Sequence, residues 1–272
     1  MQHISIEGVR LEVRHIPGST QDAPLVFLHE GLGSVDLWQT RDTDWPKAVC
    51  QATGRSGWVY SRRGYGRSDP IPDVRGRHQR NGLWGCGRHP ADYMHIEAWE
   101  VLPRVLQSLG ISRPVLVGHS DGATIALLHA SRCEVQACVV MAPHLFVEPV
   151  AIEAIADARK AYEDNAADER SLRSRLSRYH DDVDCAFWQW NDVWLSEVFR
   201  SFDIRETCRA ISVPVLGLQG TEDEYGTMDQ LTALNMAVPG ARLVTLSQCR
   251  HSPHKDQPEA TVNEIVRFLG RG

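Results

Sequence analysis

Short apolar runs recur along the chain and alternate with segments in which apolar residues return every third or fourth position. The runs are rich in Val and Leu, which is typical of strands buried on both faces of a parallel sheet. They fall at Leu25–His29, Trp58–Arg62, Val115–Gly118, Val135–Met141, Val213–Gln219 and Leu243–Leu246. The helical patterns fall at Val35–Gln51, Tyr93–Leu109, Ala123–Ser131, Met228–Met236 and Pro258–Leu269. This alternation predicts an α/β fold with a doubly wound, mostly parallel sheet.

Two shorter segments depart from the alternation. Residues 2–15 alternate apolar and polar positions on either side of Glu7-Gly8, which predicts an antiparallel hairpin at the edge of the sheet. Residues 69–92 contain several glycines and prolines and show no periodicity, so they predict a long surface loop.

A much longer segment, residues 143–210, separates two of the predicted strands. It exceeds the usual length of a crossover and contains several helical patterns. We therefore expect a helical cap here, inserted into a single core domain formed by residues 1–142 and 211–272. Three tryptophans in the cap are too close in sequence to face inward together on one helix, and we expect some of them to line an apolar substrate pocket: Trp188, Trp190 and Trp194.

Composition narrows the classes of partner and compartment. The chain has 272 residues, of which 29 are basic and 35 acidic, and it has no basic stripe, so nucleic acid is not an expected partner. Seven scattered cysteines show neither metal-like spacing nor Cys-x-x-Cys pairs, which favours free thiols and no metal. No secretory signal or membrane-spanning run is apparent, so we expect a cytoplasmic protein that does not enter a membrane. The sequence does not determine the oligomeric state, and a homo-oligomer is compatible with it.

The strongest chemical signal is Gly118-His119-Ser120-Asp121-Gly122. It follows the strand pattern Pro-Val-Leu-Val and precedes the helical pattern Ala-Thr-Ile-Ala-Leu-Leu, which is the context that a Gly-x-Ser-x-Gly nucleophile elbow requires. The sharp turn exposes the serine hydroxyl, and the start of the helix directs backbone N–H groups toward a developing oxyanion. Ser120 is therefore the candidate nucleophile.

A serine nucleophile needs a base and an acid, which follow it in the order Ser, acid, His. His251 comes after the last predicted strand and is the candidate base, with His254 as the alternative. Asp223 follows the preceding strand and is the candidate acid, although Glu222 and Glu224 beside it are alternatives. The acid would fix the histidine tautomer and stabilise the imidazolium.

The oxyanion hole is expected from two backbone N–H groups, those of Gly31 and Asp121. Gly31 lies in a glycine-containing loop after the strand Leu25–Val26–Phe27. Glu30 beside it is unusual, because a carboxylate near the oxyanion is unfavourable, and we expect its side chain to point away or to pair with an arginine. Other polar candidates at strand ends around the pocket are His29, His119 and His144, for which a structural role is the alternative.

The chain resembles the bacterial α/β-hydrolase superfamily. The resemblance rests on Ser61-Arg62-Arg63-Gly64-Tyr65-Gly66-Arg67-Ser68, on the Ser120 motif and on the segment from His251 to Pro258, and it covers nearly the whole chain. It implies an eight-stranded sheet, a helical cap after the sixth strand, no cofactor, and Ser120, Asp223 and His251 as nucleophile, acid and base. Glu30 and Arg250 depart from the commoner pattern, which often has glycine at both positions.

These features predict a serine hydrolase acting on a small apolar ester or lactone. Two alternatives stay open at this point. One is a carbon–carbon hydrolase of aromatic ring-cleavage products, although Ser252 stands where those enzymes often carry tryptophan. The other is a non-catalytic binding protein with the same fold. The presence of all three candidate residues, Ser120, Asp223 and His251, argues against this alternative.

Overall fold

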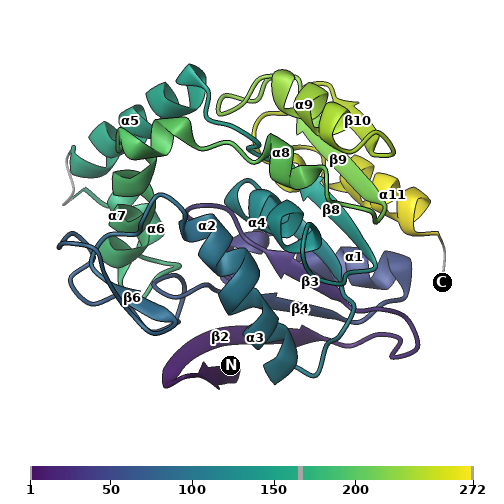
Figure 1. The fold of residues 1–272 in the computed structure, drawn as a ribbon, viewed down its shortest axis with the longest axis horizontal. Helices are drawn as coiled ribbons and strands as arrows, with labels where there is room; N and C mark the ends of the chain where they lie inside the picture. Colours follow the sequence, from purple (N-terminus) through teal and green to yellow (C-terminus); the bar gives the residue numbers. More distant parts are fainter. Residues whose placement is uncertain (1, 165–167, 271–272) are drawn as a thin grey trace.

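The computed structural model describes residues 2–164 and 168–270, and shows an eight-stranded sheet with helices on both faces (Figure 1). Residues 1, 165–167 and 271–272, which belong to the ranges expected for core and cap, lie outside the described residues. The strand order is β1-β2-β4-β3-β7-β8-β9-β10. The strands are β1 (Gln2–Ile6), β2 (Val9–Ile16), β3 (Leu25–Leu28), β4 (Gly57–Tyr60), β7 (Val115–His119), β8 (Ala137–Met141), β9 (Val215–Gly220) and β10 (Arg242–Leu246).

The sheet is parallel except at one edge. There β2 pairs antiparallel with β1 and with β4, while every pair from β4 to β10 is parallel. The β1–β2 hairpin turns at Glu7 and Gly8, which both have positive φ. These findings confirm the predicted fold class and the edge hairpin.

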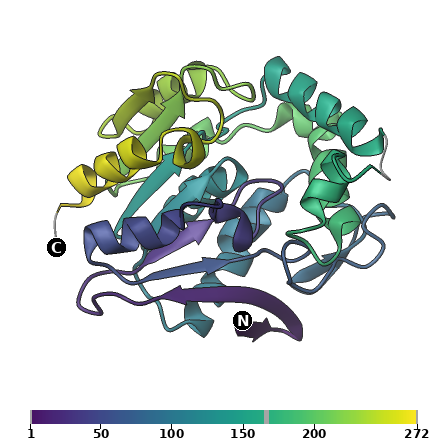
Figure 2. The same ribbon diagram turned by 180° about the vertical axis from the view of Figure 1, so that it is seen from behind.

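Helices enclose two apolar cores, one on each face of the sheet. One face is covered by α1 (Trp45–Thr53) and α11 (Pro258–Leu269), which lie side by side in Figure 2. The other face is covered by the segment from residue 93 to 108, by α4 (Asp121–Ala130) and by α9 (Asp229–Ala237). The segment from residue 93 to 108 consists of α2 (Tyr93–Ile96), a π-helical turn (Glu97–Val101) and α3 (Leu102–Ser108).

The segment after β8, the sixth strand of the main sheet, holds helices α5 (Pro149–Glu163), α6 (Leu172–Leu176), α7 (Val183–Trp194) and α8 (Arg205–Cys208). Figure 1 shows α5, α6 and α7 grouped beyond one end of the strands, whereas α8 packs on α4 and α9. A 3₁₀ turn, Val198–Ser201, joins the two parts. None of the helices in the described part of the chain is long and apolar enough to cross a bilayer.

Two local predictions were wrong. The helix expected at Val35–Gln51 is a 3₁₀ turn at Asp36–Trp38 followed by α1, because the Asp44 side chain accepts a hydrogen bond from the Lys47 N–H and thereby caps a new helix start. The segment expected as a loop at 69–92 contains a hairpin of β5 (Gln79–Asn81) and β6 (Trp84–Cys86). Its turn begins at Gly82, whose φ of +68° suits the first turn position of a type II′ hairpin.

Candidate active site

Ser120 occupies a sharp turn between β7 and α4. Its backbone φ of 53° is unusual for a residue other than glycine and holds the side chain out of the turn. Close packing of the turn requires glycine at position 122, because a Cβ there would lie 2.0 Å from the carbonyl oxygen of Leu28. The predicted strand, turn and helix are therefore present, with the helix starting at Asp121 rather than Ala123.

The structure brings the three predicted side chains together. Nε2 of His251 lies 3.0 Å from Oγ of Ser120, and Nδ1 of His251 lies 2.7 Å from Oδ1 of Asp223. The Asp223 side chain is only 1% exposed, and its Oδ1 also accepts the backbone N–H of Tyr225. With Nδ1–H donating to Asp223, Nε2 is free to accept the Ser120 proton.

The charge state of Asp223 suits this arrangement. Burial alone would raise the pKa of Asp223, but the hydrogen bond and charge of His251 outweigh it and lower the pKa below the usual value of 3.8. The carboxylate consequently stays ionised at neutral pH, as an acid that stabilises an imidazolium must. Glu222 and Glu224 do not contact the imidazole ring: Glu222 is exposed, and Glu224 instead accepts the backbone N–H of His251 at 3.1 Å.

A pocket of about 180 Å³ opens over Ser120. Its apolar wall comes partly from the helices after β8, with Ile155 on α5 and Trp190 and Trp194 on α7. The remaining lining residues are Glu30, Gly31, Leu32, His119, His144, Glu224, Tyr225, His251 and Ser252. Six of the predicted site residues thus lie in the pocket wall beside the three side chains: Glu30, Gly31, His119, His144, Trp190 and Trp194.

The loop after β3 approaches helix α7 closely at Gly31. A Cβ at this position would lie 2.2 Å from Nε1 of Trp190, so glycine is what allows α7 to pack here. Within residues 2–164 and 168–270, the backbone N–H of Gly31 and that of Asp121 make no hydrogen bond, which leaves both available to a ligand. This arrangement is consistent with the expected pair of oxyanion donors.

A family model described as "Alpha/beta hydrolase family" matches residues 25–264. The chain belongs to the α/β-hydrolase family. Solved structures of similar fold include a carboxylesterase of the thaumarchaeon Nitrososphaera gargenis, with a TM-score of 0.72, 16% identity and coverage of 98% of this chain and 97% of that one. An enol-lactonase from Burkholderia xenovorans LB400 has a TM-score of 0.69 and 18% identity, with coverage of 98% and 99%. A carboxylesterase from Bacillus subtilis has a TM-score of 0.68 and 19% identity, with coverage of 100% and 91%.

Two residues expected in the pocket of this α/β-hydrolase lie elsewhere. His29 is fully buried below the loop, where its Nδ1 contacts the carbonyl oxygen of Glu30 at 2.7 Å and its Nε2 accepts the Arg62 N–H at 3.0 Å. Trp188 is buried on a different side of α7, where the guanidinium of Arg75 lies 3.7 Å from the centroid of its ring. The helix rotates side chains by about 100° per residue, so Trp190 reaches the pocket while Trp188 does not.

The expectation for Glu30 also needs correction. Its side chain neither leaves the pocket wall nor pairs with an arginine. Instead, Oε1 lies 3.7 Å from Nζ of Lys255 and Oε2 lies 3.5 Å from Nδ1 of His119. The arginine nearest in the loop, Arg62, hydrogen-bonds the carbonyl oxygens of His29 and Glu30 rather than the carboxylate.

The Asp121 side chain points away from Ser120 into the interior. Its Oδ2 accepts a 2.5 Å hydrogen bond from the hydroxyl of Tyr93, which in turn accepts the indole N–H of Trp194. Burial raises the pKa of Asp121, which favours its neutral form. Sequence reasoning identified Asp121 but gave no sign of Tyr93 as its partner.

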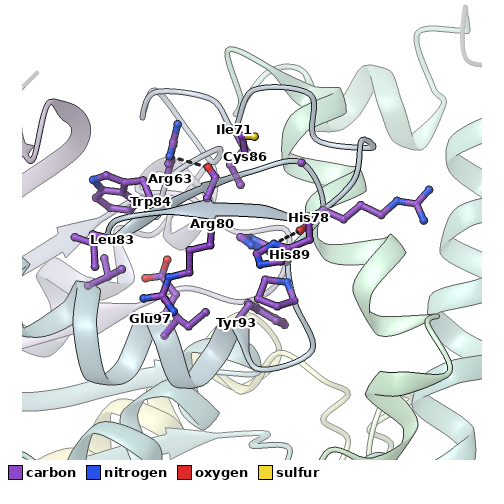
Figure 3. Close-up of a pocket in the computed structure, with 16 residues that line it drawn as sticks. Arg63, Ile71, His78, Arg80, Leu83, Trp84, Cys86, His89, Tyr93 and Glu97 are labelled. Atoms are coloured by element: carbon purple, nitrogen blue, oxygen red, sulfur yellow. Dashed lines mark hydrogen bonds between the residues drawn. The ribbon is translucent and has the colours of Figure 1, made fainter.

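A second, smaller cavity of about 50 Å³ lies beneath the β5–β6 hairpin (Figure 3). Tyr93 and Glu97 rise into it from the helical segment below, and Trp84 and Cys86 come from the hairpin. Glu97 is 8% exposed, and its Oε2 has no hydrogen-bond partner among the described residues. Neither this cavity nor any other place in the described ranges gathers three His, Cys, Asp or Glu side chains in a metal-binding arrangement.

Proposed function

We propose that this protein is a serine hydrolase that cleaves a carboxylic ester or a lactone through an acyl-enzyme. The observation that carries the proposal is the hydrogen-bonded chain from Ser120 through His251 to Asp223, with distances of 3.0 Å and 2.7 Å. A hydroxyl is a weak nucleophile at neutral pH and becomes effective when an oriented imidazole removes its proton. The chain of three residues supplies that base and its orientation.

In the proposed reaction, Ser120 Oγ attacks the carbonyl carbon while its proton passes to Nε2 of His251. The oxyanion accepts hydrogen bonds from the N–H groups of Gly31 and Asp121, and Asp223 stabilises the imidazolium. As the tetrahedral intermediate collapses, the bond to the alcohol breaks and His251 returns the proton to the leaving oxygen. Water, activated by the same histidine, then attacks the acyl-enzyme and releases the acid. No step draws on a cofactor.

The pocket favours a substrate of modest size with an apolar part. Its volume of about 180 Å³ and its walls of Trp190, Trp194, Ile155 and Leu32 suit a short aliphatic or small aromatic group. The similar fold of two carboxylesterases and an enol-lactonase agrees with this class of reaction without identifying the substrate.

Hydrolysis of p-nitrophenyl esters from acetate to dodecanoate tests the proposal. We expect turnover that peaks at short acyl chains, because the pocket is small, and that is lost in Ser120→Ala. Equal turnover by wild type and Ser120→Ala would refute the role of Ser120, and no turnover of any ester would refute the esterase activity. Circular dichroism checks that the variant is folded.

The identity of the acid is tested by a matched pair of amide substitutions. Asp223→Asn should lower kcat by roughly a thousandfold or more, since an amide cannot hold the imidazole in the required tautomer and charge state. Glu222→Gln, one position earlier and exposed, should leave kcat within about twofold of wild type. The reverse pattern would assign the role to Glu222.

A further inference from the structure

Carboxylates, but no lysine or arginine, line the pocket around Ser120 within the part of the chain that the structure describes. The two are Glu30, in the loop after β3, and Glu224, in the loop after β9. Both side chains belong to the wall of the pocket that a substrate would enter. Nothing in the reaction proposed above uses either side chain.

Glu30 is held as a carboxylate. Burial alone would raise the pKa of Glu30, but Lys255 and His119 outweigh burial and hold the pKa well below its usual range. Lys255 lies outside the pocket wall, and its Nζ stays 3.7 Å from the nearer Glu30 oxygen, beyond hydrogen-bond distance. The nearest side-chain donors, Nζ of Lys255 and Nδ1 of His119, lie 3.7 Å and 3.5 Å from the carboxylate oxygens, so the group retains capacity to accept hydrogen bonds from a ligand.

Glu224 is fixed in direction by two partners. Its Oε2 accepts the backbone N–H of His251, and its Oε1 lies 2.9 Å from Nη2 of Arg250. The Arg250 side chain is 66% exposed and is not part of the pocket wall, so solvent weakens its compensation of the carboxylate within the pocket.

We propose that Glu30 makes this pocket selective for substrate charge. The pocket accepts an ester whose acyl chain bears an ammonium group in preference to a neutral one, and a neutral one in preference to one bearing a carboxylate. The inference rests on the proposed esterase function and assigns its substrate class as neutral or amine-bearing acyl groups. Ring-cleavage products of aromatic catabolism carry a carboxylate, so the same charge argues against the carbon–carbon hydrolase alternative.

Three p-nitrophenyl esters with acyl chains of nearly equal length test the proposal at neutral pH: the butyrate, the β-alaninate and the monosuccinate. They differ at the end of the chain, which is methyl, ammonium or carboxylate. A charge several ångströms from a partly buried carboxylate changes kcat/KM by roughly tenfold or more. We therefore expect the β-alaninate to exceed the monosuccinate by at least about tenfold, with butyrate between them.

The variant Glu30→Gln keeps the shape of the side chain and removes its charge. It should reduce the difference between β-alaninate and monosuccinate to about threefold or less, mainly through faster hydrolysis of the monosuccinate. The control Glu206→Gln makes the same change on α8, at a glutamate whose side chain is 85% exposed and distant from the pocket wall, and should keep the wild-type order. Each ester is corrected for its rate without enzyme.

Different results would overturn the proposed function and the charge selectivity. If butyrate is not hydrolysed in a manner that depends on Ser120, the proposed function fails. If butyrate is hydrolysed but wild type treats all three esters alike, or prefers the monosuccinate, the charge proposal alone is overturned. The wild-type order decides this even if Glu30→Gln does not fold. A folded Glu30→Gln that keeps the wild-type ratio of β-alaninate to monosuccinate hydrolysis would remove the role of Glu30.

Discussion

The guanidinium of Arg62 donates a hydrogen bond to the carbonyl oxygen of Glu30, with 3.0 Å between Nη2 and the oxygen. Its Nη1 donates to the carbonyl oxygen of His29 at 2.5 Å. A trans peptide is planar, so the N–H of Gly31 points opposite to the Glu30 carbonyl that Arg62 holds. A buried arginine behind the loop therefore sets the direction of a proposed oxyanion donor in front of it.

Replacement of Arg62 should impair the chemical step more than substrate binding. A lysine ammonium lacks the planar pair of N–H donors with which the guanidinium binds both carbonyl oxygens. Arg62→Lys should therefore lower kcat by roughly tenfold to a hundredfold and change KM by less than about threefold. Steady-state kinetics on a p-nitrophenyl ester measures both values. Arg63→Lys is the control, because Arg63 donates to Pro70 and Gly85 in the neighbouring loop. A wild-type kcat in Arg62→Lys would contradict this role.

The two neighbouring tryptophans of α7 should respond differently to the same substitution. Trp190 lines the pocket, so Trp190→Phe should shift the preferred ester chain length and raise KM. Trp188 packs against Arg75 and Tyr162, so Trp188→Phe should lower the melting temperature and leave chain-length preference unchanged. Ester profiles and thermal melts of both variants measure the difference. If only Trp188→Phe changed the chain-length preference, the assignment of Trp190 rather than Trp188 to the pocket wall would be wrong.

Glu97 should make stability depend on pH. Burial raises the pKa of Glu97 from 4.5 to about 7, so the folded protein binds this proton more tightly than the unfolded chain does. The sign follows from linkage: the stabilising contribution of Glu97 is fully present below the unfolded value of 4.5, is lost as pH rises toward 7, and is absent above it. The loss is on the order of 3 kcal/mol.

Thermal melts at about pH 5 and about pH 8 measure this effect. Glu97→Gln carries no proton to lose, so its melting temperature should exceed that of wild type at the higher pH and approach it at the lower. Glu100→Gln is the matched control, because Glu100 belongs to the same π-helical turn but has a side chain that is 42% exposed. An equal difference between Glu97→Gln and wild type at both pH values would show that Glu97 does not titrate in this window.

The sequence predicts the fold class and the positions of the three site residues, because local pattern and chain order determine them. Buried strands of Val and Leu, separated by amphipathic helices, specify a doubly wound sheet, and strand ends then bring Ser120, Asp223 and His251 to one edge. The spacing within each motif needs no knowledge of distant contacts.

What sequence missed depends on how separate elements dock. Nearly all of α7 is buried, so its apolar pattern does not reveal that Trp190 faces the pocket while Trp188 faces Arg75. The strands β5 and β6 are short and partly polar, so they lack the alternation that predicts a strand. Arg62 was part of a quoted motif, but its contact with the Glu30 carbonyl forms only when β3 and β4 lie side by side.

The most direct test of the central claim is mass spectrometry after reaction with a fluorophosphonate, which transfers its phosphonyl group to an activated serine and releases fluoride. We predict a single adduct, on the peptide that contains Ser120, absent in Ser120→Ala and formed much more slowly in His251→Ala. An adduct on a different residue, or equal labelling of Ser120→Ala, would contradict the assignment of Ser120 as the nucleophile.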